Sequence, residues 1–158
     1  MEKVEMNKSM HLSQHFTLGE VTKTSVKTAD GNIPSHVAIE NLKNLCENWL
    51  EDLRYSHNAL FGEKDEPIII TSGYRSPEVN KAVGGSPTSN HLTGCAVDIR
   101  CIGIEQAIRY ASILLDISDG TKRDYDELLI ERNKQGRYWI HFAVRPKENR
   151  RKTAFLQT

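Results

Sequence analysis

Apolar residues recur at intervals of three and four between Val37 and Arg54, as they do in an amphipathic helix that packs against a core. A second stretch, residues 104–115, has the same spacing and predicts another helix. Residues 12–36 are rich in Thr, Ser and Gly and show no sustained period, so we predict mostly loop with a short helical turn. The two apolar stripes consist of Ala38, Leu42, Leu45, Cys46, Trp49, Leu50 and Leu53, and of Ile104, Ala107, Ile108, Ala111, Leu114 and Leu115.

Short apolar runs predict a small sheet. "EPIIITSG" (66–73) and "CAVDIRC" (95–101) are typical of buried strands, and "DELLIE" and "YWIHFAV" flank "RNKQGR" as in a hairpin. Between the first two runs, Ser76 and Pro77 are suited to open a short helix. Helices that flank a small, mainly antiparallel sheet make an α+β fold.

The length of 158 residues suits a single domain, residues 1–158. We expect its core over about residues 12–145 and frayed ends, because the tail "PKENRRKTAFLQT" is charged. The 21 basic and 21 acidic residues give no electrostatic reason for a nucleic acid or an anionic membrane as partner. We expect a monomer.

The cysteines and the start of the chain bear on its compartment. Cys46, Cys95 and Cys101 cannot all pair internally and lack zinc-finger spacing, so we predict free, buried thiols, as in a reducing compartment. No apolar run is long enough to span a membrane, and "MEKVEMNKSMHLSQHF" lacks the apolar core of a secretory signal. The sequence therefore predicts a soluble protein that is cytoplasmic as synthesised.

Two predicted buried strands each carry one residue that is out of place in a core, Asp98 and His141. A buried carboxylate is costly unless it is paired or bound to a cation. With His91, the set suits zinc and leaves a fourth position for water, whose pKa at zinc falls to about 7. Each residue alone has an ordinary structural explanation: His91 as a loop histidine, Asp98 as a buried ion-pair partner and His141 as a core histidine. Together the three predict one catalytic zinc ion per chain.

The hairpin selects a candidate general base. A three-residue loop over residues 134–136, with glycine last, would place Glu131 opposite Trp139 and on the same face as His141, roughly 7 to 8 Å away at the backbone. A four-residue loop would pair Glu131 with Tyr138 and turn it to the other face. The alternative role for Glu131 is an exposed carboxylate at a strand end.

Several segments resemble a known family. "SNHLTGCAVDI" (89–99) is similar to the pattern Ser, any, His, two residues, Gly, any, Ala, any, Asp of the zinc D-alanyl-D-alanine carboxypeptidases and phage peptidoglycan peptidases, which are related to hedgehog. "SGYRSPEVNKAVGG" resembles the family's Ser-Gly-Tyr-Arg-Ser segment, and "WIH" its closing metal-ligand strand. "LSQHFTLGEV" and the long helix resemble the start of a single-domain branch, so the likeness covers most of residues 12–144.

The resemblance implies a hedgehog-like fold and a set of site residues. The implied zinc ligands are His91, Asp98 and His141, the acid/base is Glu131 and the substrate-binding residue is Arg75. A guanidinium suits that role because it can hold a substrate carboxylate, or the scissile carbonyl, in two hydrogen bonds.

The sequence leaves the roles of some neighbouring residues open. Ser89 either donates a hydrogen bond to substrate or shapes its loop, and Tyr74 and Asn80 are interpreted as structural. Many relatives carry an acidic residue or a second histidine close to the last ligand, where this sequence has Tyr138 and Ala143. This departure places the acid/base upstream, at Glu131.

The implied activity is that of a zinc metallopeptidase that hydrolyses an amide bond in peptidoglycan peptide stems or crosslinks, of the D-Ala-D-Ala carboxypeptidase or the endopeptidase (endolysin) type. A non-catalytic module that binds cell-wall peptide and a cytosolic D-Ala-D-Ala dipeptidase are the alternatives. A wall-cutting enzyme without a signal needs another route outward, and a phage lysis system would provide one.

Overall fold

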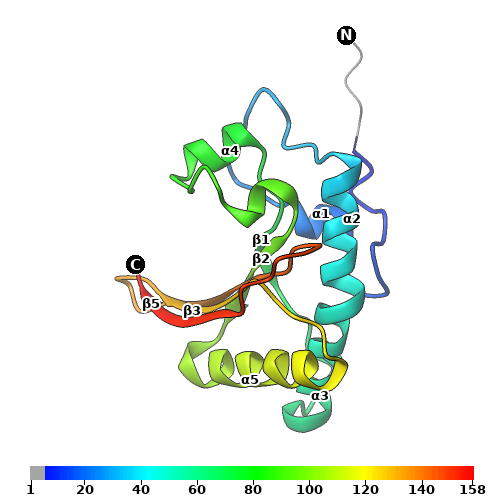
Figure 1. The fold of residues 1–158 in the computed structure, drawn as a ribbon, viewed down its shortest axis with the longest axis vertical. Helices are drawn as coiled ribbons and strands as arrows, with labels where there is room; N and C mark the ends of the chain where they lie inside the picture. Colours follow the sequence, from blue (N-terminus) through cyan, green and yellow to red (C-terminus); the bar gives the residue numbers. More distant parts are fainter. Residues whose placement is uncertain (1–5) are drawn as a thin grey trace.

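Five strands form one sheet in the order β1-β2-β4-β3-β5 (Figure 1). The strands are β1 (Ile70–Ser72), β2 (Ala96–Cys101), β3 (Glu127–Arg132), β4 (Tyr138–Ala143) and β5 (Lys152–Gln157). All neighbouring pairs are antiparallel except β3 and β5, which are parallel. This computed structural model, which describes residues 6–158, confirms the predicted α+β fold with a mainly antiparallel sheet.

The long predicted helix is present and runs further than expected. It consists of α2 (His36–Leu45), the π-helical turn η1 (Cys46–Leu50) and α3 (Glu51–Phe61), which follow one another without a break. The Ser35 side chain caps its start by accepting a hydrogen bond from the Ala38 N–H. Trp49 is buried and its ring packs against that of Phe142 on β4, with 5.0 Å between centroids, so the helix is fixed to the sheet.

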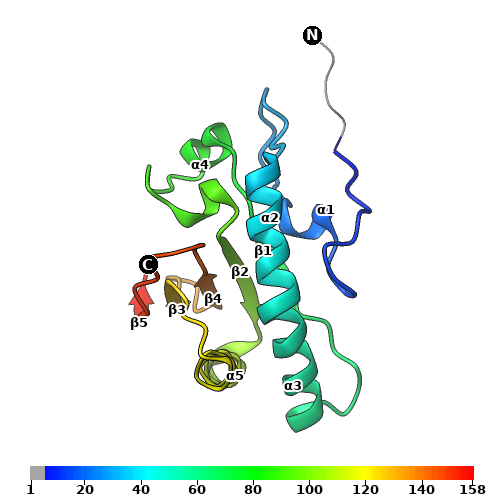
Figure 2. The same cartoon turned by 45° about the vertical axis from the view of Figure 1, so that its right-hand side comes forward.

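The sheet has two chemically different faces because side chains alternate along each strand. One face of its central strands packs against two helices, the long helix and α5 (Gly103–Thr121) (Figure 2). The core side chains that the central strands contribute there are Val97, Ile99, Leu128, Ile130, Ile140 and Phe142. The other face carries Asp98, Glu131 and His141, which makes it the polar face.

Three short helices lie in the segments that connect the longer elements. They are α1 (Leu18–Val21), α4 (Pro77–Ala82) and the 3₁₀ turn η2 (Asn90–Thr93). The α1 turn matches the short helical turn expected within residues 12–36, and Ser76 caps α4 by accepting from the Val79 N–H, as its position before Pro77 predicts.

The prediction of a frayed C-terminal segment is wrong. Residues 152–157 form β5, whose Lys152 lies opposite Glu127 on β3. The segment is held because Arg150 donates two side-chain hydrogen bonds, of 3.0 and 2.9 Å, to the fully buried carboxylate of Asp126. Two of the tail's charged residues, Arg150 and Arg151, are therefore paired with acidic residues of the domain, whereas Lys147 and Lys152 are exposed. Of the N-terminal end, residues 1–5 lie outside the described residues.

Cys46, Cys95 and Cys101 are free and buried, as predicted. Burial raises the pKa of the Cys46 and Cys101 thiols to about 12, which makes both unreactive at neutral pH. Among residues 6–158, no helix combines the length and the apolar character needed to cross a membrane.

Candidate metal centre

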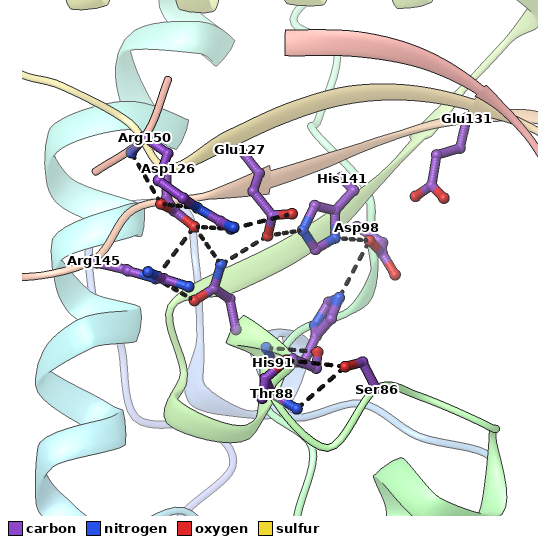
Figure 3. A network of polar contacts seen from close by, with 12 residues as sticks. Ser86, Thr88, His91, Asp98, Asp126, Glu127, Glu131, His141, Arg145 and Arg150 are labelled. Carbon is purple, nitrogen blue, oxygen red and sulfur yellow. Dashed lines mark hydrogen bonds and ion pairs between the residues drawn. The ribbon is translucent and has the colours of Figure 1, made fainter. Parts of the chain in front are cut away.

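Strand pairing brings the three predicted ligands together on the polar face. Asp98 on β2 lies directly opposite His141 on β4, and His91 approaches from η2 (Figure 3). His91 Nε2 lies 3.4 Å and His141 Nδ1 3.2 Å from Asp98 Oδ1. All three side chains are buried, and one ligand atom from each lies within 4.8 Å of the others. This convergence is what a single bound cation requires.

The hydrogen bonds around the two imidazoles fix which nitrogen faces the group. His91 Nδ1 lies 2.7 Å from the Gly73 carbonyl oxygen, which can only accept, so Nδ1 donates and Nε2 is the nitrogen that faces Asp98. His141 Nε2 likewise donates to Glu127 Oε1 at 3.0 Å, which leaves Nδ1 facing Asp98. Two imidazoles that turn one nitrogen toward a shared carboxylate, each with an outer partner of this kind, fit zinc, which would take the place of any proton held between them.

The charges of the three side chains favour the binding of a cation. Burial raises the pKa of Asp98, but hydrogen bonds to His141 and His91 outweigh this and hold it well below its usual range. Burial lowers the pKa of His141, but the hydrogen bonds with Asp98 and Glu127 raise it to about 9. The carboxylate is thus ionised at every ordinary pH and available to a cation.

Glu131 occupies the place that the hairpin register predicted. It lies opposite Trp139, Leu129 lies opposite His141, and Gly136 ends the loop with a φ of 79°. The Trp139 indole N–H donates to Glu131 Oε2 at 2.9 Å and orients the carboxylate. Burial, and then the negative charge of Asp98, raise the pKa of Glu131.

Glu127 is a site residue that sequence reasoning missed. Besides His141, it is contacted by Asn90, whose Nδ2 lies 2.7 Å from Glu127 Oε1. The hydrogen bond with His141 lowers the pKa of Glu127 to about 2, against the effect of burial. The register could have revealed it, because with Leu129 opposite His141 both Glu127 and Glu131 are diagonal neighbours of that histidine.

Arg75 and Ser89 lie beside the group. Arg75 Nη2 is 3.4 Å from Asp98 Oδ2, and its Nε donates to Ser72 Oγ at 3.2 Å. Ser89 Oγ accepts from the His91 backbone N–H at 3.2 Å, so this side chain shapes the loop that carries the histidine. Both residues line one cavity of about 400 Å³ together with His91, Asp98, Glu127, Glu131 and His141. Tyr74 and Asn80 are buried outside this lining.

Behind the group, Asp126 connects the site to the C-terminal segment. Its buried carboxylate accepts from Asn90 at 2.8 Å and from Arg150, and lies 3.2 Å from Arg145 Nε (Figure 3). Burial raises the pKa of Asp126, but the hydrogen bonds from Arg150 and Asn90 lower it to about 2. Asp126 and Arg145 hydrogen-bond to the Asn90 side chain, which in turn donates to Glu127.

Replacing Asp126 with Asn is expected to lower the free energy of unfolding at pH 7 by about 3 kcal/mol, the cost of breaking a buried ion pair. Because its pKa is depressed in the folded state, Asp126 stabilises the protein above the unfolded pKa of about 3.9, and this contribution is lost as pH falls toward 2. Urea unfolding of both proteins at pH 7, 4 and 3 tests this, since the difference should shrink below pH 4. Equal differences at pH 7 and pH 3 would refute it.

Residues 14–123, well over half of the chain, match the sequence model of Peptidase M15. The chain belongs to the M15 peptidase family. Members of this family are metallopeptidases, so the buried His-Asp-His group belongs to a metallopeptidase fold, and the family suggested by the resemblance is confirmed. The M15 match includes Arg75, His91 and Asp98 but ends before β3 and β4, so it is the pairing of β4 with β2 that adds His141. No curated protein matches the chain.

Proposed function

We propose that this M15 peptidase binds one zinc ion through His91, Asp98 and His141 and hydrolyses an amide bond in a peptidoglycan peptide stem or crosslink. The observation that carries the proposal is the pair of imidazoles whose outer nitrogens donate to Gly73 and Glu127, so that their inner nitrogens face Asp98. When bound, zinc supplies a Lewis acid and lowers the pKa of water.

Two carboxylates near the group have environments that give them different roles. Glu127 has a depressed pKa and is occupied by His141 and Asn90, so it orients the ligand His141. Glu131 has a raised pKa and lines the cavity, so it accepts a proton from the attacking water and passes it to the leaving amine. Pairs of titratable groups whose pKa values are pushed apart are typical of such a division of labour.

Arg75 binds the substrate through its guanidinium group. Its guanidinium is partly buried beside Asp98, and its Nε is held by Ser72. A guanidinium fixed there can donate to the scissile carbonyl oxygen and stabilise the negative charge that forms on it. Ser89 lines the same cavity and can add a hydrogen bond to the peptide, besides its contact with the His91 backbone.

Incubation of the zinc-loaded protein with purified peptidoglycan, with and without a chelator, tests the function. The expected result is newly freed amino groups that the chelator abolishes, and mass spectrometry of the fragments identifies the bond. Binding of the wall without release would indicate a binding module. Hydrolysis of free D-Ala-D-Ala but not of wall peptide would indicate a dipeptidase.

Replacing Trp139 with Phe is expected to lower kcat about tenfold, because Glu131 loses the donor that orients it, a charge-assisted hydrogen bond that contributes about 1.5 kcal/mol or more. The lost donor also raises the pKa of Glu131, since this hydrogen bond stabilises the ionised form. The acid limb of the kcat/KM profile should therefore move to higher pH. An unshifted limb with unchanged kcat would show that Trp139 does not position the base.

A further inference from the structure

Three basic side chains line the metal-site cavity on the side away from Glu131. Arg145, Arg150 and Lys152 belong to the segment after β4 and to the start of β5. In Figure 3, Glu131 lies to one side of His141 and Asp98, and the two arginines lie to the other. The proposed chemistry uses none of these three.

The two guanidinium groups are held in place by their inner edges. Arg150 donates to both oxygens of Asp126, and Arg145 Nε donates to Asn90 Oδ1 at 3.0 Å. The Asn149 side chain accepts from the Arg145 N–H at 2.8 Å and donates to its carbonyl at 3.0 Å, which fixes the turn. Within residues 6–158, Arg145 Nη1 and Nη2, Arg150 Nη1 and Lys152 Nζ have no hydrogen-bond partner, so these donors are available to a ligand.

The charge of the cavity also favours an anion. Its basic residues Arg75, Arg145, Arg150 and Lys152 are matched by Asp98, Glu127 and Glu131 in the lining and by the buried Asp126 behind it. The protein groups therefore balance, and a divalent cation leaves the site with an excess of positive charge. An anionic group on the substrate would be attracted to it.

The carboxylate of Glu127 lies between this basic cluster and His141, a candidate metal ligand. Arg150 Nη2 is 3.7 Å from Glu127 Oε2, and Glu127 Oε1 is 3.0 Å from His141 Nε2. An extended peptide advances about 3.3 to 3.6 Å per residue. A group bound by the outer edges of the arginines would thus sit a few substrate residues from the bond that is cleaved.

We propose that Arg145, Arg150 and Lys152 form a subsite for a free carboxylate of the substrate peptide, a few residues from the cleaved bond. The proposal rests on the peptidase function proposed above. Guanidinium groups suit a carboxylate because they offer parallel N–H donors, and Lys152 adds a point charge. The carboxylate can be the carboxyl terminus of the peptide or a side carboxylate of the stem.

Binding without turnover separates these two sources. The zinc-loaded Glu131→Gln protein is titrated with three stem pentapeptides: one with all carboxylates free, one with an amidated terminus and one with amidated side carboxylates. We expect one of the two amidations to raise Kd about tenfold and the other to leave it unchanged. Adding Lys152→Gln should raise Kd for the free peptide about threefold and reduce the effect of that amidation.

Lys147→Gln is the matched control, since Lys147 is an exposed lysine of the same turn that does not line the cavity. Its Kd values should equal those of the Glu131→Gln parent. Three peptides that bind within twofold of one another, or equal effects of Lys147→Gln and Lys152→Gln, would overturn the subsite. Failure of the wild-type protein to cleave a peptide whose carboxylate it nevertheless recognises would refute the peptidase function and leave the subsite standing.

Discussion

Replacing Glu131 with Gln is expected to lower kcat on a peptidoglycan peptide about 10³-fold while one zinc ion per chain stays bound. The reason is that Gln cannot accept the proton of the attacking water, and general base catalysis contributes about 10²- to 10⁴-fold. The amide oxygen can still accept from Trp139, so the hairpin should keep its structure. Steady-state kinetics, zinc content and thermal unfolding of the same preparation measure the three quantities.

Glu127→Gln is the matched control, because Glu127 is a second carboxylate of the same strand and face. It should weaken zinc binding roughly 10- to 100-fold, as loss of an outer partner of a ligand histidine does, and kcat should recover at saturating zinc. The assignment of the base would be wrong if Glu131→Gln kept the wild-type kcat. It would be reversed if Glu127→Gln at saturating zinc lost as much activity as Glu131→Gln is expected to lose.

Replacing His141 with Ala is expected to remove both zinc binding and activity. The zinc affinity should fall by more than the roughly 10- to 100-fold that loss of an outer partner costs, because a direct ligand is gone. Calorimetric titration with zinc after chelation measures the affinity. Activity should not return at zinc concentrations that restore the Glu127→Gln protein.

His57→Ala controls for the loss of a buried imidazole. His57 on α3 packs against Phe61 and Tyr110, with ring centroids 5.5 and 4.9 Å away, and lies outside the cavity lining. This variant should lose stability and still bind one zinc ion with the affinity of the wild type. A His141→Ala protein that bound zinc as tightly as the wild type would exclude His141 as a ligand.

The sequence predicted the hairpin side of the site well, because its register follows from local turn geometry. A three-residue loop that ends in Gly136 fixes which side chains share a face of the hairpin. The position of Glu131 on the same face as His141 follows from this register. The pairing of Asp98 with His141 could not be predicted in this way, because β2 and β4 are far apart in the chain and their adjacency depends on the order of strands in the sheet.

Other differences have equally local causes. The run 66–73 yields only three strand residues, Ile70–Ser72, with an irregular register opposite β2. The C-terminal segment was predicted to fray because charge was taken as a sign of solvation. Its arginines instead meet acidic partners, Asp126 for Arg150 and Asp119 and Asp124 for Arg151, which no pattern along the chain reveals.

The most direct test of the metal centre is a crystal structure of the zinc-loaded protein with anomalous scattering measured at the zinc absorption edge. The account predicts one anomalous peak per chain, about 2.0 to 2.2 Å from His91 Nε2, an Asp98 carboxylate oxygen and His141 Nδ1, with His141 Nε2 still bonded to Glu127. A peak elsewhere, or none between these three side chains at saturating zinc, would contradict it.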